Sequence, residues 1–126
     1  MRFARVVFTV AGVWGLLLIG ALYFAFDLIG TQYPPAITHP DFYFGFLAVT
    51  LAWQVAFLLI AADPLRQRPI MIAAMLEKFV YVATLIALFA QGRIEAGQVG
   101  AAIPDVVFGL LFVAAYLKTA AASASA

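Results

Sequence analysis

Apolar residues form four long runs along the chain, and polar residues gather between the runs. The runs cover about 6–26, 42–62, 70–89 and 101–117. At about 1.5 Å of rise per residue, helices of this length match the roughly 30 Å hydrocarbon core of a bilayer. Turn-forming prolines lie between the first and second runs and again after the second. We therefore predict an all-α, integral membrane four-helix bundle, built as a single four-span domain over residues 1–118.

The fourth run is the weakest of the four. It begins at Ala101 or Pro104 and ends before Lys118, and only alanine, serine and one threonine follow it. Such a segment has few side chains that could join a core. We expect residues 119–126 to be a disordered tail or a frayed helix end.

Composition points to the same class of protein. Hydrophobic residues make up 67% of the chain and charged residues 10%, whereas soluble proteins average about 45 to 50% apolar and about 25% charged residues. A soluble enzyme or a disordered chain is thereby excluded. With no cysteine and only His39 among histidines, we expect no metal site and no cofactor, and the net charge of +1 argues against a nucleic-acid partner.

The basic residues predict an orientation, because short cytoplasmic loops carry an excess of lysine and arginine. With the N-terminus inside, only Arg93 falls on the outer side. The cytoplasmic side then holds Arg2, Arg5, Arg66, Arg68 and Lys118. We expect both termini to be cytoplasmic, in a multi-pass protein of the inner (cytoplasmic) cell membrane.

Small and polar residues that recur every three or four positions predict the inner face of each helix. In the first two runs these residues are Thr9, Gly12, Leu16, Gly20, Tyr23 and Asp27, then Tyr43, Leu47, Thr50, Gln54 and Ala61. In the last two they are Ala73, Glu77, Tyr81 and Thr84, then Ala101, Asp105 and Gly109.

Glu77 is the central candidate for function, because ionisable groups inside a membrane are functional hypotheses by default. It lies about 11 Å inside the third span, and Gln54 reaches a similar depth on the antiparallel second span. The two can meet if these helices are neighbours. Glu77 could bind a ligand or move a proton, form a structural hydrogen bond to Gln54 or Tyr81, or contact a partner subunit.

Lys78 and Asp105 each have a simpler interpretation. Adjacent helix residues do not face each other, so we expect no direct pair between Glu77 and Lys78. Lys78 lies on a more apolar side of its helix and is predicted to extend toward the cytoplasmic end. Asp105 follows Pro104, as at many helix starts; alternatively it lies beside Asp27 near the outer mouth of the bundle.

Two family resemblances add expectations. The stretch 33–81 is similar to a group of short bacterial four-span membrane proteins, which implies the topology but no activity. Its motifs are His39-Pro40-Asp41-Phe42-Tyr43, Trp53-Gln54, Asp63-Pro64, Arg68-Pro69 and Leu76-Glu77-Lys78-Phe79.

A second resemblance is to the EXPERA family of emopamil-binding and sigma-two-receptor-like proteins. It rests on Phe26-Asp27-Leu28, on Phe46-Leu47 through Gln54 to Ile60-Ala61, and on Arg68-x-Ile70. It implies a four-span bundle with a polar pocket for sterol-like or amine ligands. The acidic residue in that family's second span has no counterpart at positions 50–53 here.

We therefore expect a small multi-pass membrane protein without evident catalytic machinery. Either it binds a lipid-like molecule in a semi-polar pocket, with membrane lipid as its other partner, or it packs as an accessory subunit of a larger membrane complex. The predicted polar core contains Glu77, Gln54, Tyr81, Lys78, Asp27 and Asp105. The alternatives are a sterol or isoprenoid isomerase with Glu77 as proton shuttle, and a proton or ion path.

Overall fold

The computed structural model describes residues 1–125, which form helices joined by short turns and contain no strand. The helices are α1 (Arg2–Leu22), α2 (Phe26–Gln32), α3 (Pro40–Ala62), α4 (Arg68–Ala90), α5 (Ala96–Gly100) and α6 (Ile103–Ala124). Four segments are long and apolar enough to cross a bilayer, namely α1, α3, α4 and the stretch formed by α5 and α6. The all-α, four-span architecture is thereby confirmed.

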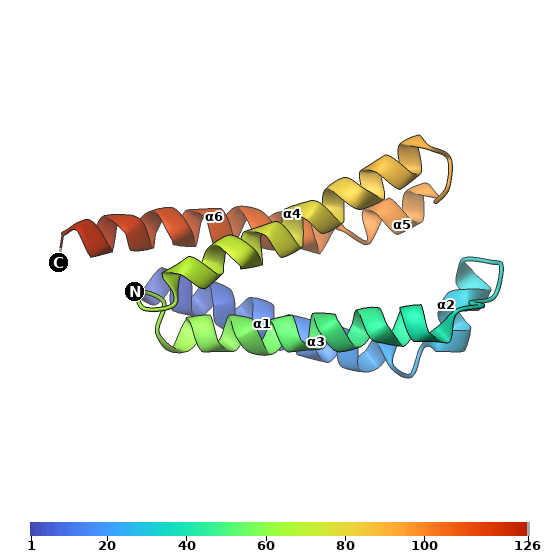
Figure 1. Ribbon diagram of the computed structural model, residues 1–126, viewed down its shortest axis with the longest axis horizontal. Coiled ribbons are helices and arrows are strands. Elements are labelled where there is room, and N and C mark those ends of the chain that lie inside the picture. The colour runs from blue at the N-terminus through green and yellow to red at the C-terminus, as the bar shows by residue number, and fades with distance from the viewer. Residues whose placement is uncertain (126) are drawn as a thin grey trace.

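The long helices pack as two pairs (Figure 1). Helix α1 lies along α3, α4 lies along α6, and α1 and α6 make most of the contact between the pairs. Although α3 and α4 are consecutive, they share few contacts, because α4 diverges from α3 after their tight turn. We call the end with that turn and the start of α1 the closed end, and the opposite end, with α2 and α5, the splayed end.

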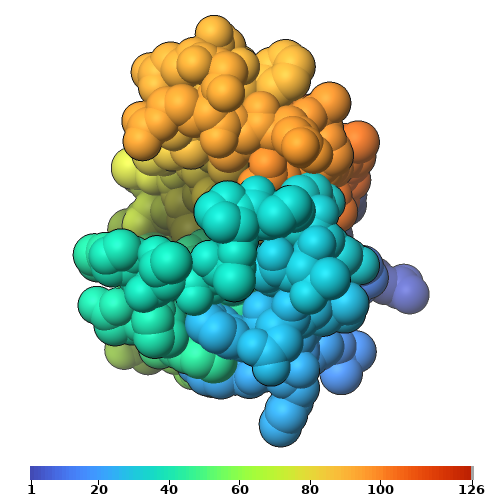
Figure 2. All heavy atoms as spheres, turned by 90° about the vertical axis from the view of Figure 1, so that its right-hand side faces the viewer, coloured from blue at the N-terminus to red at the C-terminus, as the bar shows by residue number. Residues whose placement is uncertain are grey.

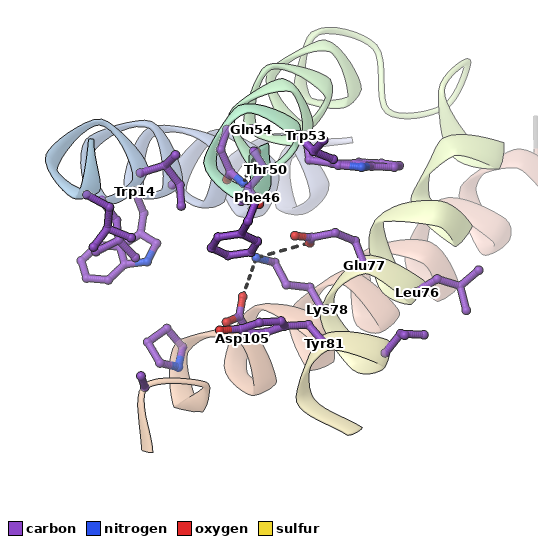
Figure 3. A pocket seen from close by; sticks show the side chains of 18 of the residues that line it. Trp14, Phe46, Thr50, Trp53, Gln54, Leu76, Glu77, Lys78, Tyr81 and Asp105 are labelled. Carbon is purple, nitrogen blue, oxygen red and sulfur yellow. Dashed lines mark hydrogen bonds and ion pairs between the residues drawn. The ribbon is translucent and has the colours of Figure 1, made fainter. Parts of the chain in front are cut away.

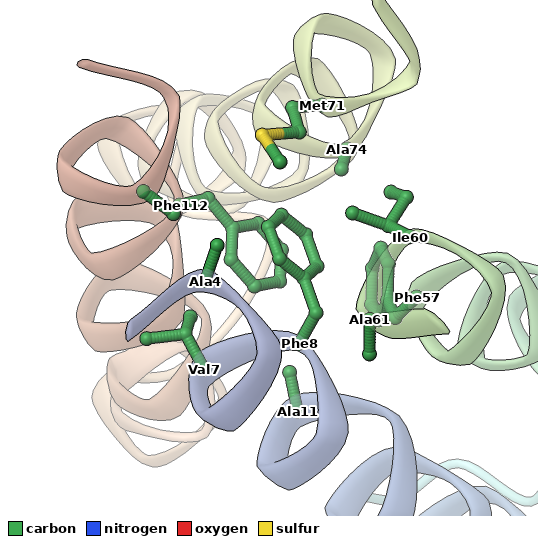
Figure 4. Packing of buried hydrophobic residues seen from close by; sticks show 11 residues of the cluster. Ala4, Val7, Phe8, Ala11, Phe57, Ile60, Ala61, Met71, Ala74 and Phe112 are labelled. Carbon is green, nitrogen blue, oxygen red and sulfur yellow. The ribbon is translucent and has the colours of Figure 1, made fainter. Parts of the chain in front are cut away.

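Aromatic rings fill the closed end (Figure 4). The rings of Phe8 and Phe112 stack with centroids 4.3 Å apart, and Phe57 meets Phe112 edge-on at 5.0 Å. All three side chains are fully buried. Small residues surround them and let the four helices approach: Ala4, Ala11, Ala61, Ala74 and Ala115. Close packing of this kind, rather than water exclusion, drives helix association in lipid.

Proline and glycine mark the helix ends. Pro40, Pro69 and Pro104 occupy the first turns of α3, α4 and α6, where the missing backbone N–H has no helical partner to lose. Gly92, with φ of +70°, follows the end of α4 in a conformation that favours glycine.

The first span differs from its predicted bounds. Helix α1 begins at Arg2 and ends at Leu22, and a short turn separates it from α2. The Leu22 carbonyl at this helix end accepts two hydrogen bonds, one from the Ala25 backbone N–H at 3.2 Å and one from the Tyr43 hydroxyl at 2.6 Å. Asp27 consequently belongs to α2 and not to α1.

The inner face of α1 was also predicted only in part. Gly12 is buried, as expected, but Thr9 is exposed and Leu16 is half-buried. The buried face consists of Ala4, Val7, Phe8, Ala11, Gly12, Gly15 and Ile19. On α4, Thr84 is exposed and donates its hydroxyl hydrogen bond to the Val80 carbonyl of its own helix at 2.7 Å. A threonine that is satisfied in this way needs no partner on another helix.

The expected tail is instead largely helical. Helix α6 continues to Ala124, and Thr119 is fully buried near Met71. The Thr119 hydroxyl donates to the Ala115 carbonyl at 2.8 Å. Alanine is the best helix former, which explains why a segment without large side chains continues the helix. Ala126 lies outside the described residues.

Candidate functional site

A cavity of about 930 Å³ lies between the two helix pairs, on the splayed side of the aromatic core. Side chains from α1, α3, α4 and α6 line it, and both tryptophans of the chain, Trp14 and Trp53, are among them. Most of its wall is apolar. Figure 3 shows that a small group of charged side chains faces the interior from the α4 and α6 side. We call this space the interhelical cavity.

Three ionisable residues form a cluster on this wall. The Lys78 ammonium donates a hydrogen bond of 2.8 Å to Asp105 Oδ1 and lies 3.5 Å from Glu77 Oε2. Lys78 is only 7% exposed. Its ammonium also lies 5.3 Å from the Phe57 ring centroid, which places the cluster next to the aromatic core. We call these three residues the charged triad.

Lys78 lines the cavity, but its expected extension toward the cytoplasmic end and the expected lack of a pair with Glu77 were both wrong. It is buried and directed at α6, and it forms an ion pair with the adjacent Glu77. The rule for adjacent residues describes where the Cβ atoms point, whereas long side chains can turn back toward each other. Gly109 lets α6 pack closely on this part of α4, because a Cβ there would lie 2.9 Å from the Phe79 ring and 3.3 Å from Lys78 Cβ. The sequence did contain one signal for this contact. Asp105 and Gly109 are four residues apart, so on α6 a carboxylate lies one turn from a residue without a side chain.

Glu77 Oε2 is a buried oxygen with no hydrogen-bond partner among the described residues. An unsatisfied buried acceptor costs about 1 to 3 kcal/mol. The triad also holds two carboxylates against one ammonium. Glu77 therefore lies on the cavity wall with a side chain that is 20% exposed and one buried oxygen that accepts no hydrogen bond, in a region with one excess acidic group.

Gln54 and Tyr81 line the cavity as predicted, but neither forms a hydrogen bond with Glu77 among the described contacts. Gln54 is 2% exposed, and its amide nitrogen donates to the Thr50 carbonyl at 3.0 Å. It packs against Gly15, where a Cβ would overlap its side chain. The Tyr81 ring stacks with Phe46, with centroids 6.1 Å apart. Gln54 is thus fixed on α3, while Tyr81 joins α4 to α3.

Asp27 lies outside the cavity, contrary to the prediction. It is exposed in the first turn of α2. The predicted stripe assumed one continuous helix, and the break after Leu22 turns the chain away from it. For Asp105 both interpretations hold, because it follows Pro104 in the first turn of α6 and also lines the cavity.

Part of the cavity wall reaches the side of the bundle. Val49, Leu76 and Val80 line it from α3 and α4, and each is more than half exposed on the outside of the bundle. At the splayed end, by contrast, the segment after α2 comes up against α5 (Figure 2). A Cβ on Gly97 would lie 3.4 Å from the Tyr33 hydroxyl. We call the gap between α3 and α4 at Val49, Leu76 and Val80 the slot. It faces the region that lipid occupies in a membrane.

Comparison of the chain with protein-family models, curated proteins and solved structures finds no match. The structure by itself defines the class: a four-span helical membrane protein with an ionisable interhelical cavity. The two family resemblances remain predictions.

Proposed function

We propose that the protein binds a lipid-like small molecule in the interhelical cavity. The observation that carries this proposal is a largely apolar cavity of about 930 Å³ with the Glu77 carboxylate on its wall, whose Oε2 is ion-paired with Lys78 but accepts no hydrogen bond. Ligand pockets for small molecules typically measure about 300 to 1,000 Å³ and combine apolar walls with a few polar groups. Entry through the slot between α3 and α4 would let the ligand come directly from the bilayer.

The triad favours a ligand whose polar head donates a hydrogen bond. Glu77 offers an acceptor, and the Lys78 ammonium is already bound to Asp105. An alcohol or amine head can satisfy Glu77, whereas a carboxylate or phosphate head would meet the excess acidic group. The cavity would thus select its ligand in two ways, by attracting an alcohol or amine head and by repelling a carboxylate or phosphate head.

The apolar tail of the ligand would contribute little discrimination. Trp14, Trp53 and Leu76 provide an apolar wall, but lipid tails already surround such a ligand in the bilayer, so its transfer from lipid into the cavity gains little hydrophobic free energy. The polar head must therefore decide which molecule is retained. This reasoning makes Glu77 the residue to test.

The two tryptophans give a direct readout of occupancy. In Trp14→Phe, Trp53 is the single fluorophore and lies on the cavity wall. The protein in phosphatidylcholine nanodiscs is titrated with dodecanol, dodecylamine or dodecanoate while Trp53 emission is recorded. We expect a saturable change with the alcohol, the amine or both, and none with dodecanoate.

Glu77→Gln, built on the same background, should weaken that binding about tenfold, because a hydrogen bond to a charged acceptor contributes about 1.5 to 3 kcal/mol. The matched control is Glu95→Gln, an exposed glutamate outside the cavity, which should leave binding unchanged. A non-saturable response that is equal for the three amphiphiles would contradict the proposal. Mass spectrometry of lipids that co-purify with the protein would then identify the natural ligand.

The isomerase alternative is favoured by one observation, namely space for a ring system beside Glu77. In that case Glu77, in its protonated form, would give a proton to one carbon of a double bond, and the resulting carboxylate would take a proton from another carbon of the substrate. The double bond moves, and both the substrate's composition and the protonated Glu77 are restored. Incubation of a bound sterol or isoprenoid olefin in deuterated water tests this reaction. Deuterium should enter the olefin with the parent protein and not with Glu77→Gln; an unlabelled olefin would exclude the isomerase.

A further inference from the structure

The closed end carries a strong excess of positive charge that the protein does not neutralise. Five of the seven basic residues lie in the segments that meet there, with one of the six acidic residues, Asp63. The five are Arg2, Arg5, Arg66, Arg68 and Lys118. Among the described residues, both ion pairs belong to Lys78. The Asp63 carboxylate accepts a hydrogen bond from the backbone N–H of Arg66, at 3.3 Å, and forms no ion pair with a side chain of this group.

Arg68 is held in a fixed orientation. Its guanidinium carbon lies 3.9 Å from the centroid of the Tyr116 ring, and its Nε donates to the Tyr116 carbonyl at 3.4 Å. These contacts tie the start of α4 to α6. The terminal guanidinium nitrogens have no hydrogen-bond acceptor among the described contacts. Stacking on a ring orients the guanidinium but leaves its charge unpaired.

A second cation is anchored close by in the fold. The Lys118 ammonium lies 4.7 Å from the centroid of the Phe3 ring, which ties α6 to α1. Lys118 follows Tyr116 by two residues on α6, so it lies at a similar height to Arg68 but on another side of that helix. Arg66 precedes Arg68 in the turn between α3 and α4. The closed end thus presents cations contributed by α1, α4, α6 and this turn.

These cations lie at the depth of lipid phosphates. Helix α4 begins at Arg68 and has 23 residues, a length of roughly 34 Å. This length is close to the roughly 30 Å thickness of the hydrocarbon core, so its first residue lies at the membrane surface. The splayed end has the opposite character, because Asp27, Asp41 and Glu95 outnumber Arg93 there.

We propose that the closed end binds the phosphate of an anionic phospholipid, with Arg68 as the principal donor. The planar guanidinium matches the spacing of two phosphate oxygens and binds them in bidentate fashion. Many membrane proteins carry an excess of positive charge on one side, because lysine and arginine in short loops determine how the chain is oriented in the membrane. That preference does not explain why a guanidinium is held on a ring with its terminal nitrogens free, an arrangement that orients it for a phosphate. This site is separate from the interhelical cavity and does not depend on its ligand.

The test compares the retention of an anionic and a zwitterionic lipid by the parent protein and by variants of Arg68. Delipidated protein in detergent is titrated with phosphatidylglycerol or phosphatidylcholine, and bound lipid is counted by native mass spectrometry. We expect preferential retention of phosphatidylglycerol. Arg68→Gln should weaken that retention about tenfold, the size expected for loss of a charge-assisted, bidentate contact. Arg68→Lys should retain more phosphatidylglycerol than Arg68→Gln does, because lysine keeps the positive charge but cannot bind two phosphate oxygens as the planar guanidinium can.

Two control variants distinguish a defined phosphate-binding site from a general electrostatic attraction between the closed end and anionic lipid. Arg93→Gln removes an arginine from the splayed end, and Arg2→Gln removes an exposed one from the closed end; both should retain phosphatidylglycerol nearly as the parent does. Equal losses in Arg2→Gln and Arg68→Gln would overturn the site, as would equal retention of the two lipids. Inorganic phosphate should not displace the lipid at equimolar concentration. Displacement would assign the site to free phosphate instead.

Discussion

The closed end and the cavity half of the molecule are built from the same helices, yet one is filled and the other is hollow. At the closed end, phenylalanines from three helices fit between alanines, and the four long helices converge. In the cavity half, α3 and α4 diverge, and the facing positions hold Glu77, Lys78 and Gln54. A ring packed among small residues brings helices together in lipid, whereas a charged residue needs a specific partner.

This difference separates stability from function along the bundle axis. The closed end has complementary packing and no opening toward lipid among its core residues, so it holds the two helix pairs together. The cavity half retains an unsatisfied acceptor and a lateral slot. Such features cost stability and are retained where binding requires them. Variants in the two halves should therefore have different consequences.

The largest loss of stability is expected for Phe112→Ala. This change removes the ring that stacks on Phe8 and meets Phe57, and truncation of a buried phenylalanine costs about 3 to 5 kcal/mol. Unfolding by added dodecyl sulfate in mixed micelles measures the free energy. Phe24→Ala is the control, because Phe24 is 95% exposed at the splayed end. Equal losses in the two variants would show that the closed end does not hold the bundle together.

Lys78→Met should have the next largest effect, about 3 kcal/mol, because two partly buried carboxylates would then lose the cation that pairs with both of them. The same unfolding experiment measures it. The double variant Lys78→Met/Asp105→Asn should recover part of the loss, since it removes one of the carboxylates left unpaired. If the double variant is less stable than the single one, the triad does not behave as a coupled unit.

The sequence was sufficient to predict the four spans and the presence of Glu77, Lys78 and Gln54 within them, because hydrophobic runs are a local property. The directions of the side chains were harder to predict. Helices α3 and α4 are apolar around most of their circumference, so no contrast between two faces marks the side that is buried. The approach of Lys78 to Asp105 depends on Gly109 of another helix, and the loss of Asp27 from the site depends on the break after Leu22.

A smaller effect is expected from removal of residues 119–126. The deletion eliminates Thr119, which is fully buried near Met71, and should destabilise the closed end by about 1 kcal/mol, within the usual range for loss of one buried residue. Deletion of residues 123–126 is the control, because its described positions are exposed. Unfolding midpoints for the two truncations provide the comparison. Identical midpoints would mean that Thr119 adds nothing to the packing.

The smallest effect on stability is expected for Glu77→Gln without added ligand, within about 0.5 kcal/mol of the parent. The change removes the 3.5 Å ion pair with Lys78, but Glu77 Oε2 has no hydrogen bond to lose, and Lys78 keeps its shorter contact with Asp105, which leaves one charge of each sign. Unfolding measured with and without dodecanol or dodecylamine checks this expectation, because a ligand that binds only the folded state stabilises it. The parent should gain stability with at least one of these amphiphiles and Glu77→Gln should gain less. A large loss in the ligand-free variant would instead make Glu77 a structural residue, and the difference between the two halves of the molecule would disappear.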